Sequence, residues 1–94
     1  MKDRELELIR GVLRRHPELT RALLFGSRAK WTASPSSDVD LALDGHLDHL
    51  GAEAIASELD ELPLPYRFDV KALPSVPYLP LREHIARVGI KIYG

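Results

Sequence analysis

The first quarter of the chain combines a helical pattern with a short apolar run. Residues 3–15 carry apolar side chains at helical spacing, and basic residues near their end suit the helix dipole. Pro17 ends this predicted helix, because proline cannot donate the backbone hydrogen bond that a helix needs. Residues 22–25 are all apolar and precede Gly26, which is typical of a buried strand that enters a tight turn. The helical positions expected in the core are Leu6, Leu8, Ile9, Val12 and Leu13.

The middle of the chain predicts a loop, a second strand and a second helix. Residues 31–37 are rich in Ser, Thr and Pro, as loops are. Residues 39–43 then form a strand that the turn residues Asp44 and Gly45 close. Residues 47–62 have helical periodicity and end at Pro63. The apolar positions expected on one face of this helix are Leu47, Leu50, Ile55, Leu59 and Leu62.

The last third predicts one more strand and one more helix. Residues 66–73 alternate, so that Asp69 and its neighbours at even spacing face away from the apolar side of the strand. Residues 79–88 form a helix with Gly89 as its C-terminal cap and a brief end at 90–93. Its expected inward positions are Leu81, Ile85 and Val88. This order of elements predicts the α+β class, with a small mixed β-sheet and helices packed against it.

Composition fits one small domain spanning residues 1–94. The sequence is 45% hydrophobic and 29% charged, with a net charge of −1. The lack of cysteine excludes disulfides and thiolate metal sites. No apolar run approaches the roughly 18 residues of a membrane-spanning helix, and no export signal opens the chain, so a cytoplasmic protein is expected. A domain this small has little room for a deep pocket, and we expect an enzyme of this size to share its site with a partner.

The charges are unevenly distributed along the sequence. Residues 1–37 hold eight basic and four acidic residues, residues 38–69 hold one and nine, and residues 70–94 hold four and one. Phosphate binding favours a continuous basic face, so direct nucleic-acid binding is not expected. Asp38, Asp40 and Asp69 interrupt apolar, strand-like runs. The acids that fit a solvated helix face are Asp48, Glu53, Glu58, Asp60 and Glu61.

Two short motifs are candidates for chemistry. Gly26 and Ser27 follow a buried strand, where glycine permits a sharp turn and free backbone N–H groups can bind an anion. The same pair also suits a plain turn and helix cap. Asp38 and Asp40 are two residues apart, so on a strand both carboxylates project from one face. Alternatively, Asp38 caps a turn and Asp40 faces water on an edge strand.

Asp69 is the third candidate carboxylate. It reaches the same place if its strand pairs with residues 39–43. Like charges about 4 Å apart repel by roughly 4 kcal/mol at an effective dielectric of 20, which a bound cation relieves. Three hard oxygen donors with open positions suit Mg²⁺ that also binds substrate phosphates.

The spacing of these motifs resembles a known family. Ten residues separate Ser27 from Asp38, giving the pattern G-S-x10-D-x-D after an apolar strand. The run LFGSRAKWTASPSSDVDLAL is similar to the minimal nucleotidyltransferase (MNT) domains of the DNA polymerase β superfamily. The likeness includes Asp69 and the closing LREHIARVGIKIYG, and so spans nearly the whole chain. Lys30 and Trp31 depart from the Arg-Gly that many members have there.

The resemblance implies a palm-like nucleotidyltransferase fold and a role for each motif. Gly26 and Ser27 would hold the β- and γ-phosphates of a nucleoside triphosphate, and Arg28 would help to neutralise them. Asp38, Asp40 and Asp69 would be the catalytic and metal-binding residues. The implied cofactor is Mg²⁺, as two ions, with Mn²⁺ as a substitute.

The same resemblance implies the reaction and the partner. A nucleoside monophosphate, AMP from ATP, would pass to a hydroxyl of a partner protein or a small substrate. The partner would be a small all-helical protein of the HEPN or related substrate-binding type, and the chain would act as the antitoxin of a toxin–antitoxin pair. The alternative is a non-catalytic module that keeps the fold and neutralises or scaffolds a helical partner. A nucleic-acid polymerase is disfavoured by size and by the weak positive face.

Overall fold

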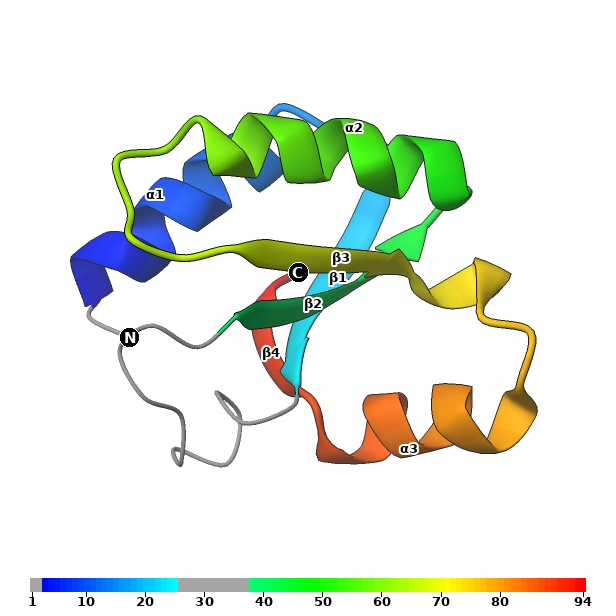
Figure 1. Ribbon diagram of the computed structural model, residues 1–94. Coiled ribbons are helices and arrows are strands. Elements are labelled where there is room, and N and C mark those ends of the chain that lie inside the picture. The colour runs from blue at the N-terminus through cyan, green and yellow to red at the C-terminus, as the bar shows by residue number, and fades with distance from the viewer. Residues whose placement is uncertain (1–2, 26–37) are drawn as a thin grey trace.

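Four strands and three helices make up the chain in a computed structural model that describes residues 3–25 and 38–94 (Figure 1). The helices are α1 (Asp3–Leu13), α2 (His49–Asp60) and α3 (Leu79–Val88), with a short 3₁₀ turn at Leu73–Ser75. The strands are β1 (Leu19–Phe25), β2 (Val39–Gly45), β3 (Phe68–Ala72) and β4 (Ile90–Tyr93). They form one sheet in the order β3-β2-β1-β4. Strand β1 is antiparallel to β2 and β4, whereas β2 and β3 are parallel. The predicted α+β class with a mixed sheet is confirmed.

The sheet lies between two layers of helices (Figure 1). Helices α1 and α2 cover one face, where the large core includes Ile9, Leu41 and Leu59, all with no exposed surface. Helix α3 covers part of the other face, where Ile85 packs with Leu23 and Ala42. Because side chains alternate along a strand, Val39, Leu41 and Leu43 of β2 point to α1 and α2, and Asp40 and Ala42 point to the α3 side.

The fourth strand was not predicted. The sequence predicts only a brief end at residues 90–93, because a pattern of four residues is too short to be assigned to a strand, and a single isoleucine of the segment is buried. In the structure β4 pairs with β1, and the Arg10 Nε of α1 donates to the backbone oxygen of Ile92 at 2.6 Å. Tertiary contacts, rather than local periodicity, therefore determine this strand. Strand β1 also begins at Leu19, earlier than the predicted start at residue 22.

Each of the helices α1, α2 and α3 buries fewer residues than predicted. In α1, Leu6 and Leu8 were expected in the core but are only half-buried. Leu50 is 70% exposed, because α2 starts at His49 and its buried stripe runs through Ala52, Ile55 and Leu59. At 100° per residue, Leu50 lies about 140° away from Ile55 around the helix. In α3 only Ile85 is buried, while Leu81 and Val88, also expected inside, are 41% and 40% exposed.

The cap predicted at Gly89 is confirmed, although its reason differs from the usual one. The Gly89 N–H donates to the oxygen of Ile85 at 2.8 Å, as a cap does. Its φ of −65° is open to any residue, so the left-handed conformation is not required. A side chain is excluded instead by crowding, since a Cβ would lie 2.7 Å from the Ile85 oxygen and 3.0 Å from the Leu23 Cβ. This close approach holds the end of α3 against β1.

Some of the acidic residues expected on a solvated helix face also make contacts within the protein. Asp48 caps α2 by accepting a hydrogen bond from the Gly51 N–H at 3.0 Å. Glu58 lies 2.7 Å from the Nε2 of His16 and 3.4 Å from Arg15, and so ties α2 to the end of α1. None of the helices in the described ranges has the length and apolar character to cross a lipid bilayer.

Candidate functional site

The structure brings Asp40 and Asp69 side by side. They are Cα partners in the parallel pairing of β2 with β3. Paired residues on neighbouring strands direct their side chains to the same face, which here is the α3 side of the sheet. Asp38 precedes β2 by one residue and is exposed. The sequence analysis required Asp69 to pair beside residues 39–43, and this placement is observed.

The end of β1 lies on the other side of Asp40. Phe25, the last residue of β1, is the Cα partner of Asp40. Phe25, Asp40 and Asp69 therefore form one row across three adjacent strands. Gly26, Ser27 and Arg28, the candidate phosphate-binding residues, lie outside the described residues, as does Trp31. Gly26 directly follows Phe25 in the sequence.

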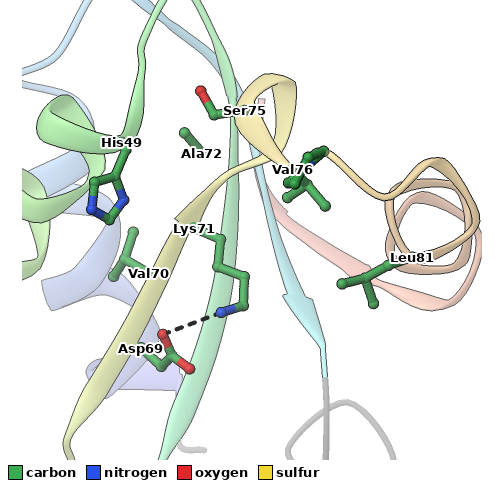
Figure 2. A pocket seen from close by; sticks show the side chains of 9 residues that line it. His49, Asp69, Val70, Lys71, Ala72, Ser75, Val76 and Leu81 are labelled. Atoms are coloured by element: carbon green, nitrogen blue, oxygen red, sulfur yellow. Dashed lines mark ion pairs between the residues drawn. The ribbon is translucent and has the colours of Figure 1, made fainter.

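The electrostatics show negative charge in excess around Asp40. Its half-buried position raises the pKa of the Asp40 carboxyl, and the nearby charges of Asp69 and Asp38 raise that pKa further. Lys71 acts in the opposite direction. The Nζ of Lys71 lies 3.7 Å from the Asp69 Oδ1, as Figure 2 shows. Among the described charges that act on Asp40, Lys71 is thus the cation.

The carboxylates suit a divalent cation by their chemistry. Oxygen donors on one face of a rigid sheet are the ligands that Mg²⁺ and Mn²⁺ prefer. As the side chains stand, the described residues contain no group of three or more His, Asp or Glu positioned to hold a metal ion. Asp69 instead pairs with Lys71, and its side chain is 52% exposed, which leaves the carboxylate room to turn toward Asp40. The oxygen donors therefore fit such an ion once the Asp69 side chain turns toward Asp40.

A pocket of about 380 Å³ adjoins the acidic cluster. It is lined by residues 69–72 of β3, His49 of α2 and Leu81 of α3, together with residues 75–77 between β3 and α3 (Figure 2). Sequence reasoning missed this pocket. It placed Lys71 on the same face of the strand as Asp69, two residues away, but gave Lys71 no role at the site. The pocket had no signal, because it depends on how α2 and α3 flank the sheet.

The comparisons with known proteins identify a family and a shared fold. The family model described as polymerase beta, nucleotidyltransferase matches residues 7–94. A chain of a toxin–antitoxin complex solved with AMP-PNP is 26% identical with a TM-score of 0.79, covering 95% of this chain and 73% of that one. A chain of the complex between a tri-AMPylated HEPN toxin of Shewanella oneidensis and its MNT antitoxin is 24% identical, with a TM-score of 0.75 and coverage of 100% and 73%.

A more distant match has the same fold. It is a putative nucleotidyltransferase from Sulfolobus solfataricus, 16% identical with a TM-score of 0.56, and the match covers 92% of this chain and 73% of that one. No curated protein matches the sequence. The family match over residues 7–94 shows that the chain belongs to the polymerase β nucleotidyltransferase family.

Proposed function

We propose that the chain, as a single domain of residues 1–94, transfers AMP from ATP to a hydroxyl of a partner protein or a small substrate, with Mg²⁺ or Mn²⁺ as cofactor. The observation that carries this proposal is the row formed by Phe25, Asp40 and Asp69 across three strands. It sets the carboxylates beside Phe25, the residue that precedes the Gly26–Ser27 motif in the sequence. A relative of 26% identity was solved with AMP-PNP, an ATP analogue, which supports ATP as the donor.

The residues have separate roles in the proposed in-line displacement. Asp38, Asp40 and Asp69 would hold two divalent ions, whose positive charge would stabilise the charge that develops on the phosphates. Gly26 and Ser27 bind the β- and γ-phosphates through backbone N–H groups, and Arg28 neutralises their charge. The acceptor oxygen bonds to the α-phosphorus, the bond from that phosphorus to the bridging oxygen breaks, and pyrophosphate leaves. Asp69, the most exposed of the paired carboxylates, takes the proton of the hydroxyl.

The proposed partner is a small all-helical protein of the HEPN type. Two of the similar solved chains come from toxin–antitoxin complexes, and in one the HEPN toxin is AMPylated. By analogy, this chain acts as an antitoxin that modifies its toxin. We also propose a cytoplasmic location, where the proposed donor ATP is available.

A second candidate function is docking without catalysis. Leu79, Leu81 and Val88 of α3 are 51%, 41% and 40% exposed, and such apolar side chains favour contact with another protein. In this case the chain would neutralise or scaffold a helical partner by binding alone.

Label transfer distinguishes the two functions. The chain is incubated with a small helical protein of the HEPN type, Mg²⁺, and ATP labelled at either the α- or the γ-phosphorus. We expect the α-label on the partner, and no γ-label, because the proposed bond break lies between these two phosphates. A stable complex without label would support docking alone, and transfer of the γ-label would contradict nucleotidyl transfer.

A further inference from the structure

Lys71 shares the face of β3 that carries Asp69. The two residues are two apart on the strand, so their side chains project to the same side of the sheet. Asp69 is the Cα partner of Asp40. Lys71 is the partner of Ala42, which packs with Ile85 of α3. The Lys71 side chain therefore stands next to the candidate carboxylates, on the α3 side of the sheet.

The Lys71 side chain reaches back along the strand toward Asp69 (Figure 2). Its Nζ lies 3.7 Å from the Asp69 Oδ1, and the two side chains are 42% and 52% exposed. In residues 3–25 and 38–94, this is the only ion pair made by the acidic cluster of Asp38, Asp40 and Asp69. Arg67 lies two residues before Asp69 and is exposed, but within the same ranges it pairs with none of these aspartates. Lys71 is therefore the counter-ion of the cluster in the described part of the chain.

The charge of Lys71 acts on the whole cluster rather than on Asp69 alone. Burial raises the pKa of the Asp40 carboxyl, the charges of Asp69 and Asp38 raise it further, and the Lys71 charge acts against this rise. An ammonium group that offsets the repulsion between carboxylates has the same sign as a divalent ion. The ammonium and such an ion therefore compete for the same carboxylate.

The observed side chains favour the ammonium. No group of three His, Asp or Glu among the described residues stands ready to hold a metal ion. An ion shared by Asp40 and Asp69 needs the Asp69 oxygens within about 2.0–2.2 Å, so Asp69 has to turn from Lys71 toward β2. The ion would also repel the ammonium if it stayed in place. Because both members of the pair are about half exposed, they can separate at low cost.

We propose that Lys71 is a positioning residue for the cation site: it holds the Asp69 carboxylate in the metal-free protein and has to release it before a divalent ion binds between Asp40 and Asp69. Lys71 thereby sets the concentration of free ion at which the site fills. This inference rests on the proposed function for the presence of the ion, and on the observed ion pair for the role of the lysine.

Mn²⁺ binding without nucleotide tests this role independently of catalysis. The free Mn²⁺ signal in electron paramagnetic resonance gives the dissociation constant at low salt. We expect Lys71→Met, which keeps an unbranched side chain, to bind Mn²⁺ about 3- to 5-fold more tightly than the wild-type chain, as the strength of a half-exposed ion pair allows. Lys71→Arg, which keeps the charge, should stay within about 2-fold of the wild-type chain. Unchanged affinity in Lys71→Met, or no binding by either protein, overturns the proposal.

Two further variants separate release of Asp69 from a general effect of charge. Lys91→Met removes the same charge from β4, the opposite edge strand, where Lys91 is exposed. We expect it to leave the Mn²⁺ affinity within about 2-fold of the wild-type value. In an Asp69→Asn background, Lys71→Met should add no tighter binding, because the carboxylate that the lysine holds is absent. An equal gain from Lys91→Met, or an undiminished gain in the Asp69→Asn background, overturns the proposal.

The wild-type chain offers a test that needs no substitution. Mg²⁺ is titrated into the ¹³C-labelled protein, and the side-chain signals of Lys71 Cε and Asp69 Cγ are followed. We expect both signals to move with the same midpoint, with Lys71 Cε ending near the position of a solvated lysine. A Lys71 signal that stays fixed while the Asp40 and Asp69 signals move contradicts the release.

The proposed function and the role of Lys71 fail in different ways. Tighter Mn²⁺ binding by Lys71→Met, without label transfer by the wild-type chain, would retain the role of Lys71 and reject the nucleotidyl transfer. Label transfer by the wild-type chain, with equal Mn²⁺ affinity in Lys71→Met, would retain the reaction and reject the role of Lys71.

Discussion

Replacing Asp40 with asparagine is expected to reduce AMP transfer about 100- to 1,000-fold, while the protein stays folded. Asparagine keeps the size of the side chain but removes the charge that lies between Asp69 and the end of β1. The measurement is the rate of α-label transfer at saturating Mg²⁺ and ATP. Asp60→Asn is the matched control, because Asp60 is an exposed acid at the end of α2 and loses the same charge far from the sheet edge. Full activity in Asp40→Asn would contradict the catalytic role.

The same substitution is expected to raise the melting temperature of the metal-free protein by a few degrees. Burial and the charges of Asp69 and Asp38 raise the pKa of Asp40, so the folded state binds more protons than the unfolded state just above the usual pKa of an aspartate. The contribution of Asp40 to stability is therefore greatest at low pH and falls as the pH rises through its folded pKa. The gain from Asp40→Asn should appear at neutral pH and shrink in acid. A loss of stability at pH 7 would show that Asp40 makes favourable contacts instead.

The second large effect is expected in α2, where replacing leucine with alanine costs much more stability at one position than at another. Leu59 has no exposed surface and belongs to the main core, whereas Leu50 is 70% exposed. Leu59→Ala is expected to cost about 2–5 kcal/mol of unfolding free energy, because it removes buried methyl groups and leaves a cavity. Leu50→Ala is expected to stay within about 0.5 kcal/mol.

Denaturant unfolding of both variants measures this difference. For a domain of this size, a loss of about 3 kcal/mol also lowers the Tm by roughly 12–24 °C. Comparable losses in the two variants would mean that α2 presents a different face to the sheet than the structure gives it.

The sequence predicted the positions of the candidate carboxylates better than it predicted the buried faces of the helices. Asp40 lies on β2 and Asp38 directly precedes that strand, so their closeness follows from a separation of two residues in the sequence. The position of Asp69 next to Asp40 required a long-range pairing of β2 with β3. The strand pattern predicted this position only on the condition that the two strands pair, and the family resemblance also included Asp69. This pairing depends on strand register, which the buried pattern of Val39, Leu41 and Leu43 determines.

Other features depend on contacts that a local pattern does not contain. Periodicity alone placed Leu50 inside, because it could not locate the start of α2 at the Asp48 cap. Strand β4 is too short for its alternation to be distinguished from a tail, and it becomes a strand only by pairing with β1. The pocket at the edge of β3 arises where α2, β3 and α3 meet, so no single segment predicts it.

Paramagnetic broadening by Mn²⁺ tests most directly whether Asp38, Asp40 and Asp69 share one cation site. Mn²⁺ is added in substoichiometric amounts to the ¹⁵N-labelled protein, and signal loss is followed residue by residue in the wild-type chain and in Asp40→Asn. We predict that the signals of all three aspartates broaden together, that those of Glu53 and Glu58 on α2 persist, and that Asp40→Asn weakens the effect. Broadening centred on α2, or a sharp Asp69 signal beside a broadened Asp40, would contradict a shared site.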